Sequence, residues 1–313
     1  MSGLAILCPG QGGQHPAMFD FALAAGAGGD LIEEARRIVG EDPVGLARTA
    51  TPRLFENAVA QPLVCAATLA AWEALRGGLP APRAVAGYSV GELAAWGCAG
   101  GLDPVEAVGL AGRRAAAMDQ ASVGPAGLLG LRGLPLARLE SLTLAAGAEL
   151  AIVNGPDHAV AGGRGAALDR LAAAATAAGA TTVQRLPISV AAHTGALAGA
   201  VAPFAAALAG SGLRDPAWPV LSSLGGVPLR LRAEGVEALS RQLAARLEWS
   251  HVVAAAAELG CTVFLELGPG QALSRMVGEL LPGAAARSVA DFRSVEGVLR
   301  WVEARLQPGI LGG

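Results

Sequence analysis

The residues best suited to covalent chemistry lie in the stretch Gly87-Tyr88-Ser89-Val90-Gly91. The apolar run Ala84-Val85-Ala86 precedes it and an apolar helical segment follows at once. This is the strand–turn–helix context in which a G-x-S-x-G motif presents an exposed nucleophile. The glycines permit a tight turn, and the N-terminus of the helix favours the negative charge of a tetrahedral intermediate. Ser89 is therefore the candidate nucleophile for acyl transfer.

A serine hydroxyl needs a general base, and histidine is the usual one. Of the four histidines, His158 falls in an expected hairpin turn and His251 lies early in a helix, both of which are typical surface or packing positions. His15 follows a glycine-rich loop and could lie near the site. His193 ends a strand-like run over 186–193, and catalytic groups of α/β proteins collect at strand ends. His193 is the leading candidate, although the pattern alone leaves the other histidines open.

The glycine-rich loop after the first apolar run invites a dinucleotide-binding interpretation. The G-x-G-x-x-G spacing requires glycine where this chain has His15. Asp30 falls near the ribose-binding position, but it opens a helical stretch and does not end a second strand. A tight loop after the first strand can instead supply a backbone N–H to an oxyanion hole.

Composition excludes several other kinds of chemistry. The chain has 313 residues, of which 53% are hydrophobic and 16% charged, and a net charge of −3 gives no footprint for nucleic acid. All 23 basic residues are arginine, so a Walker A lysine, a Schiff-base lysine and a lysine general base are excluded. The cysteines are widely spaced without a C-x-x-C pair, so we expect neither a metal site nor a disulfide framework. They are Cys8, Cys65, Cys98 and Cys261.

The apolar runs are interrupted short of a membrane span, and the first residues lack the basic segment of a signal peptide. We therefore expect a soluble, cytoplasmic protein.

The elements that must position these residues alternate between strands and helices. Strand-like runs at 4–7, 84–86 and 262–265 lie between helical segments such as 63–76 and 104–119, which predicts an α/β domain with a mainly parallel sheet. Residues 125–189 follow the order β-α-β-β-α-β, which is the ferredoxin-like pattern. We therefore expect a small ferredoxin-like subdomain at 125–189, inserted into a large α/β domain formed by 1–124 and 190–313.

Several motifs together resemble the malonyl-CoA:acyl-carrier-protein transacylases. The opening Cys8-Pro9-Gly10-Gln11-Gly12-Gly13-Gln14 is similar to their F-P-G-Q-G-x-Q, and Gly87 to Glu92 to their G-H-S-x-G-E. The resemblance spans nearly the whole chain and implies a hydrolase-like α/β core. Further motifs that fit in order are Ala60-Gln61-Pro62, Val153-Asn154-Gly155-Pro156, Leu186 to His193 (L-P-x-S-V-P-S-H) and Glu266 to Gly270 (E-V-G-P-G).

The resemblance implies a role for individual residues at the reacting centre. Ser89 would be the nucleophile and His193 its base, with the imidazole oriented by the backbone carbonyl of Gln242 instead of an acidic residue. Gln11 and Val90 would offer the N–H groups of the oxyanion hole.

The resemblance also implies how the substrate is held. Arg114 matches the arginine that binds the free carboxylate of the malonyl group, a contact that suits a guanidinium fork. A solvated helix arginine remains the alternative for Arg114, which has Arg113 beside it. Gln61 and Asn154 are carried over as substrate-binding residues.

One departure distinguishes subgroups of the family, because Tyr88 stands where the fatty-acid enzymes have histidine. The variant G-Y-S-V-G-E resembles the acyltransferase (epsilon) subunit of malonate decarboxylase. This resemblance implies malonyl-CoA as substrate, no bound cofactor, and as acceptor the delta-type carrier subunit with its phosphoribosyl-dephospho-CoA arm, in association with other decarboxylase subunits. The alternatives are a fatty-acid or polyketide transacylase with a phosphopantetheine carrier, a thioesterase-like hydrolase, and an inactive carrier-binding module.

Overall fold

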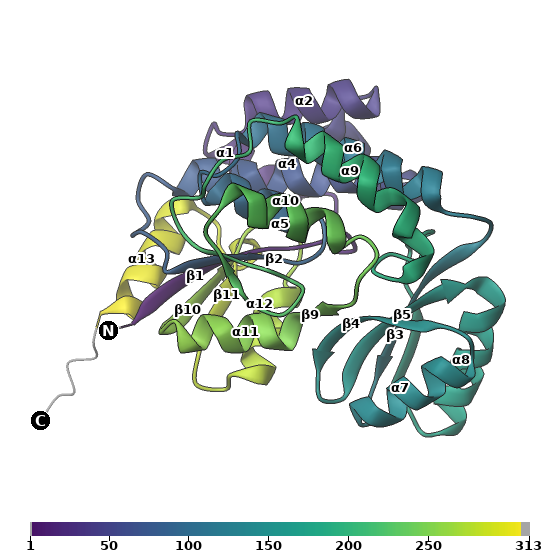
Figure 1. Cartoon of the computed structure of the whole chain (residues 1–313). Coiled ribbons are helices and arrows are strands. Elements are labelled where there is room, and N and C mark those ends of the chain that lie inside the picture. The colour runs from purple at the N-terminus through teal and green to yellow at the C-terminus, as the bar shows by residue number, and fades with distance from the viewer. Residues whose placement is uncertain (1, 308–313) are drawn as a thin grey trace, which may run out of the picture.

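The larger part of the molecule is built on a six-stranded sheet (Figure 1). The computed structural model describes residues 2–307, and the larger sheet has the strand order β11-β10-β1-β2-β7-β8. Neighbouring strands run parallel except β7 and β8, which pair antiparallel. The strands are β1 (Gly3–Cys8), β2 (Ala84–Gly87), β7 (Val220–Leu221), β8 (Pro228–Leu229), β10 (Cys261–Glu266) and β11 (Ala285–Ser288).

Helices cover both faces of this sheet, which explains why β1 and β2 are buried along their whole length. In Figure 1 the layer with α2, α4, α6 and α9 lies above the sheet, and α11 and α12 lie below it. The helices are α1 (Asp20–Ala24), α2 (Gly29–Val39), α3 (Pro43–Thr49), α4 (Asn57–Leu75), α5 (Gly91–Cys98), α6 (Pro104–Ala121), α9 (Ala198–Ala209), α10 (Arg232–Arg241), α11 (Trp249–Glu258), α12 (Ala272–Leu280) and α13 (Val295–Leu306).

Helix α4 is the most enclosed element of the core. Its 19 residues have a mean hydropathy of 1.4, so by length and composition alone it could cross a membrane. In the folded chain 83% of this segment is buried, against α2, α5 and α6 among others. The hydropathy of α4 is thus that of a helix surrounded by protein on every side.

A second, five-stranded sheet has the order β6-β3-β5-β4-β9 and an apolar core of its own. Four strands and two helices follow the predicted order β3-α7-β4-β5-α8-β6. The fifth strand, β9, comes from far along the chain and runs parallel to β4, an addition that the sequence pattern does not predict. The elements are β3 (Ala126–Arg132), α7 (Leu136–Ala145), β4 (Glu149–Gly155), β5 (His158–Arg164), α8 (Gly165–Ala177), β6 (Thr182–Arg185) and β9 (Leu247–Glu248).

The predicted α/β fold with an inserted ferredoxin-like unit is confirmed, whereas the strand expected over 186–193 is wrong. This segment is irregular, and the N–H of Ile188 donates to the carbonyl of Leu186 in a tight turn. Pro187 has no N–H to give to a ladder, and His193 has a left-handed backbone with φ 62°. The segment returns the chain from the small sheet without joining the large one.

Candidate active site

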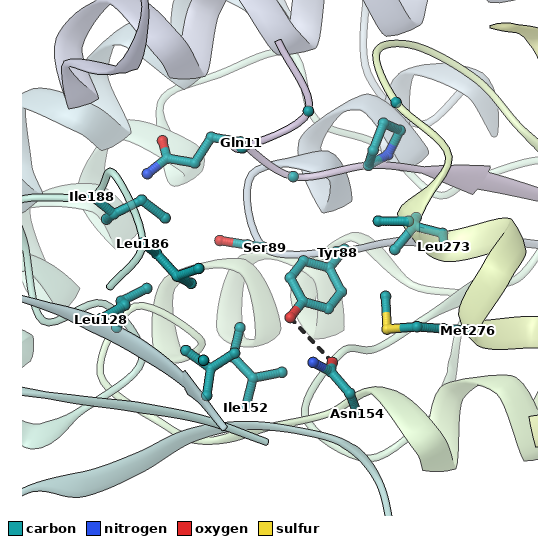
Figure 2. A pocket seen from close by; sticks show the side chains of 18 of the residues that line it. Gln11, Tyr88, Ser89, Leu128, Ile152, Asn154, Leu186, Ile188, Leu273 and Met276 are labelled. Atoms are coloured by element: carbon teal, nitrogen blue, oxygen red, sulfur yellow. Dashed lines mark hydrogen bonds between the residues drawn. The ribbon is translucent and has the colours of Figure 1, made fainter. Parts of the chain in front are cut away.

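Ser89 lies in a sharp turn between β2 and α5, at the carboxyl edge of the large sheet. Its backbone is left-handed, with φ 57°, a conformation that a non-glycine residue keeps only when its surroundings enforce it. The enforcement comes from close packing: a Cβ on Gly87 would collide with the backbone of Glu92, and one on Gly91 with the carbonyl of Cys8. The flanking glycines are thus required by backbone approach, and the turn directs the Ser89 hydroxyl into a cavity (Figure 2).

His193 lies against this hydroxyl. The distance from Ser89 Oγ to His193 Nε2 is 2.8 Å, and Nδ1 lies 2.5 Å from the backbone carbonyl of Gln242. Because a carbonyl oxygen only accepts, Nδ1 carries the proton and Nε2 presents its lone pair to the serine. Burial, aided by the charge of Arg114, lowers the pKa of His193 to about 3, although the bond to Gln242 opposes this shift. The imidazole is therefore neutral and able to accept a proton from Ser89.

Arg114 of α6 extends its guanidinium to the same point. Nη2 donates to Ser89 Oγ at 3.3 Å and to Gln242 Oε1 at 3.2 Å, and Nη1 donates to Gln61 Oε1 at 2.7 Å. The residue is 1% exposed, and burial lowers its pKa to about 9 while the charge of Glu92 opposes the shift. Its Nε has no partner within residues 2–307. A buried cation with only neutral partners thus lies beside the nucleophile.

Behind Arg114, Gln242 and Glu92 continue the polar cluster. Gln242 Nε2 donates to the carbonyl of Ser89 at 3.2 Å and to Glu92 Oε2 at 3.3 Å. Glu92 Oε2 also accepts from the hydroxyl and the N–H of Ser223. Burial raises the pKa of Glu92 to about 7, against the lowering effects of Ser223 and Arg114. No role for Glu92 follows from the sequence alone, although its place directly after the G-x-S-x-G motif is a signal that it lies near the site.

On the other side of Arg114, two amides lead to the surface. Gln61 Nε2 donates to Asn57 Oδ1 at 2.6 Å. Asn57 Nδ2 in turn donates to the carbonyl of Ala115 and to Asp119 Oδ1. The carbonyl of Ala115 and the carboxylate of Asp119 can only accept, so Asn57 must turn its NH₂ group toward them and its oxygen toward Gln61. Gln61 then turns its own NH₂ group toward Asn57 and its oxygen toward the guanidinium.

The two expected oxyanion donors flank the nucleophile. Gln11 lies in the loop after β1 and lines the cavity, and Val90 directly follows Ser89 as the N-cap residue of α5. In the described part of the chain, the backbone N–H of neither residue donates to a protein acceptor. Both N–H groups therefore remain available to a bound oxygen.

The cavity has a volume of about 770 Å³ and lies between the two sheets. Tyr88, which adjoins Ser89, donates from Oη to Asn154 Oδ1 on the facing wall at 3.1 Å (Figure 2). Asn154 Nδ2 in turn lies 3.4 Å from His158 Nε2. The deeper walls are apolar, which limits water around the serine. They include Leu128, Ile152, Leu186, Ile188, Leu273 and Met276.

The structure thus brings Ser89, His193, Arg114, Gln61 and Gln242 into one hydrogen-bonded cluster. Asn154 lines the opposite wall and bonds to Tyr88, not to this cluster. The other histidines are placed as follows: His251 is exposed, His15 lines the cavity, and His158, partly exposed at the start of β5, also lines it.

Comparison with known proteins gives consistent matches. The model of the acyl transferase domain family matches residues 6–281. The malonyl CoA-acyl carrier protein transacylase of Mycobacterium tuberculosis is 35% identical over 295 residues, covering 91% of this chain and 96% of the relative. The Escherichia coli K12 protein of the same name is 29% identical over 303 residues, covering 93% and 97%.

Solved structures agree along nearly the whole length. The malonyl CoA-acyl carrier protein transacylase of Coxiella burnetii superposes with a TM-score of 0.89 at 28% identity and 98% coverage of both chains. A malonyl-transacylase solved in complex with a type II polyketide acyl-carrier protein also gives a TM-score of 0.89 at 28% identity, covering 96% of this chain and 99% of that one.

Proposed function

The chain belongs to the acyl transferase domain family and, within it, to the malonyl-CoA:acyl-carrier-protein transacylases, and we propose that it moves a malonyl group from malonyl-CoA to a carrier thiol through an acyl-enzyme on Ser89. The observation that carries this proposal is the Ser89–His193 pair with the unpaired cation of Arg114 beside it. The pair supplies the nucleophile and base for acyl transfer, and the cation selects an acyl group that ends in a carboxylate.

Acyl transfer proceeds in two symmetrical halves. His193 Nε2 takes the proton of Ser89 Oγ as the oxygen attacks the thioester carbonyl, and the N–H groups of Gln11 and Val90 stabilise the oxyanion. On collapse the C–S bond breaks, the CoA sulfur takes the proton from Nε2, and the malonyl ester on Ser89 remains. The carrier thiol then gives its proton to Nε2 and attacks the ester, and Ser89 recovers the proton as it leaves.

The malonyl carboxylate is bound by Arg114 during both halves. Its guanidinium lies 3.3 Å from Ser89 Oγ, so a carboxylate close to the reacting carbonyl is within its reach. Gln61 and Gln242 hold the guanidinium through their side-chain oxygens and fix the direction of the fork. An acetyl group would leave this buried cation without an anionic partner, so it gains less binding free energy than a malonyl group.

Trapping the acyl-enzyme tests this proposal. Incubation with malonyl-CoA should add one malonyl group to the intact protein in mass spectrometry, and Ser89→Ala should remove it. Ser211→Ala is a matched control, because its hydroxyl bonds only local backbone. An adduct of undiminished yield on Ser89→Ala would disprove the nucleophile, and rapid release of free malonate without a thiol acceptor would identify a hydrolase instead.

For the acceptor, we propose the carrier subunit of a malonate decarboxylase with its phosphoribosyl-dephospho-CoA arm. The supporting observation is Tyr88, whose hydroxyl bonds Asn154 on the facing wall and so shapes the cavity that receives the arm. The names of the relatives favour an ordinary acyl carrier protein as the alternative. Side-by-side transfer assays separate the two: faster malonyl transfer to the decarboxylase carrier is expected, and preference for the phosphopantetheine carrier would reassign the acceptor.

A further inference from the structure

Glu92 is a buried carboxylate that no step of acyl transfer uses. It is 0% exposed, and within residues 2–307 its Oε1 has no hydrogen-bond partner and neither oxygen forms an ion pair. Among the described residues, its hydrogen-bond donors are Ser223 and Gln242, both neutral. A buried charge with so little compensation is costly, so Glu92 stays ionised only where another charge offsets it from a distance.

Arg114 presents the same problem with the opposite sign. The guanidinium is buried, it donates to the neutral acceptors Gln61 Oε1, Gln242 Oε1, Ser89 Oγ and Met118 Sδ, and no carboxylate of the described chain forms an ion pair with it. The buried polar cluster beside Ser89 therefore contains one cation, Arg114, and one anion, Glu92, neither of which forms an ion pair within the described residues.

Gln242 connects them. Arg114 Nη2 donates to Gln242 Oε1 at 3.2 Å, and Gln242 Nε2 donates to Glu92 Oε2 at 3.3 Å. A guanidinium can only donate and a carboxylate can only accept, so the amide has one possible orientation, with its dipole aligned between the two charges.

We propose that Glu92 is the counter-charge of Arg114, held one amide away by Gln242 so that the guanidinium stays charged while its Nη groups bond only neutral acceptors, which a substrate carboxylate can displace. A carboxylate in direct contact would stabilise the cation equally well but would occupy the fork that must bind the malonyl group. Glu92 is thus a positioning residue that acts through Gln242 and Arg114. The inference rests on the proposed function, since it explains the lack of an ion pair at Arg114 by the substrate carboxylate that binds there.

A thermal-unfolding cycle without substrate tests this pairing at pH 8, above the pKa of about 7 to which burial raises Glu92. Glu92→Gln keeps the shape and an oxygen for Ser223 and Gln242 but removes the charge, and it should lower the Tm by at least about 2 °C. In the Arg114→Met background Glu92 has lost its counter-charge, so the same substitution should raise the Tm. A change of sign is expected only if the two charges compensate each other.

Glu266→Gln serves as the matched control. Glu266 is equally buried, but its two oxygens accept from the N–H groups of Leu273 and Ser274, away from Arg114. Its substitution should change the Tm by the same amount in both backgrounds. If the Glu92→Gln variant does not fold, the proposal is still tested by the double variant Glu92→Gln/Arg114→Met, which should fold and should have a higher Tm than Arg114→Met alone.

Equal effects of Glu92→Gln in both backgrounds would overturn the counter-charge and leave Glu92 as a structural partner of Ser223. The proposed function is tested separately, by the malonyl-over-acetyl preference of Arg114→Met in transfer assays. An unchanged preference would overturn the carboxylate clamp whatever the unfolding cycle shows, so the two failures are distinguishable.

Discussion

The two walls of the cavity differ in how far their polar side chains are exposed to solvent. The wall from the large domain is dry: Arg114, His193, Glu92 and Gln242 are each at most 2% exposed and share one hydrogen-bond cluster with Ser89. The wall from the small domain is mixed: Leu128, Ile152 and Val160 are buried there, whereas other side chains of the same wall are partly or fully exposed. Among these are Arg132, His158, Thr182 and Gln184.

This difference separates reaction from recognition. Every group proposed to exchange a proton or bind the acyl carboxylate belongs to the large domain, where burial fixes geometry and strengthens charge interactions. The small domain has its own core, and its residues Leu128, Ala151, Ile152 and Val160 also join the core of the large domain. Polar contacts between the two include the Tyr88–Asn154 bond and the Arg132–Glu279 ion pair. The dry wall can therefore keep one chemistry while the exposed wall adapts to different donor and carrier arms.

Removal of the base should have the largest effect on the dry wall. His193→Ala should lower malonyl transfer by about 10³-fold, because Ser89 then has no group to accept its proton. The measurement is kcat for transfer to the carrier. His251→Ala, an exposed residue of α11, is the control and should retain full activity. Similar activity of the two variants would place the base elsewhere in the cavity.

The dry wall should also make the fold sensitive to acid. The pKa of His193 is about 3 in the folded chain against an ordinary 6.5, so between these values the unfolded chain binds more protons at this position. The stability that depends on neutral His193 is complete above about pH 6.5 and is lost as the pH falls toward 3. Urea unfolding of the wild type between pH 7.5 and 5 should show a steeper decrease than His193→Gln. Equal slopes would contradict a depressed pKa.

Loss of the cation should change the selectivity between acyl groups. Arg114→Ala should slow malonyl transfer by about 10²-fold, since a charged two-pronged contact is lost, while acetyl transfer is kept or gained. Competition between malonyl-CoA and acetyl-CoA measures the ratio. Arg113→Ala, its exposed neighbour on α6, should leave the ratio unchanged. A ratio unaltered in Arg114→Ala would rule out the clamp.

Where the two walls meet, a smaller effect is expected. Tyr88→Phe removes the donor to Asn154 Oδ1 at a cost of about 1 kcal/mol, which corresponds to a KM change of about three- to tenfold. The rate of acyl-enzyme formation at saturating malonyl-CoA should hardly change, because Ser89 and His193 keep their contact. Stopped-flow acylation and steady-state KM for each carrier separate these quantities. A large fall in the acylation rate would give Tyr88 a role in the chemistry.

The exposed wall should tolerate change best. The side chains of Arg132 and Glu279 are 39% and 47% exposed, so Arg132→Ala should cost less than about 1 kcal/mol of stability. Its effect on the carrier KM should weaken with added salt. Arg185→Ala breaks a comparable pair with Asp169 inside the small domain and is the control. A loss of stability as large as that from a core variant would show that the ion pair holds the domains together.

The sequence determined the fold and the reacting pair because both depend on local patterns. Alternating apolar runs and helical segments predict the two sheets. The glycines on either side of Ser89 indicate a tight turn, in which neighbouring backbone passes too close for a Cβ atom. The irregular return segment was mistaken for a strand, since Val190 and its neighbours are apolar for reasons of burial and not of sheet pairing. Strand β9 was missed because two residues are too short to give a period.

The tertiary structure alone decided which distant polar groups share the dry cluster. Glu92, Gln242, Arg114 and Gln61 come from four separate helices or their ends, and no spacing along the chain relates them. A sequence shows that a residue can carry a charge, but the free energy of that charge depends on the groups that surround it after burial. The elbow at Ser89 could be predicted from the chain, whereas the open cation beside it is a property of the packed core.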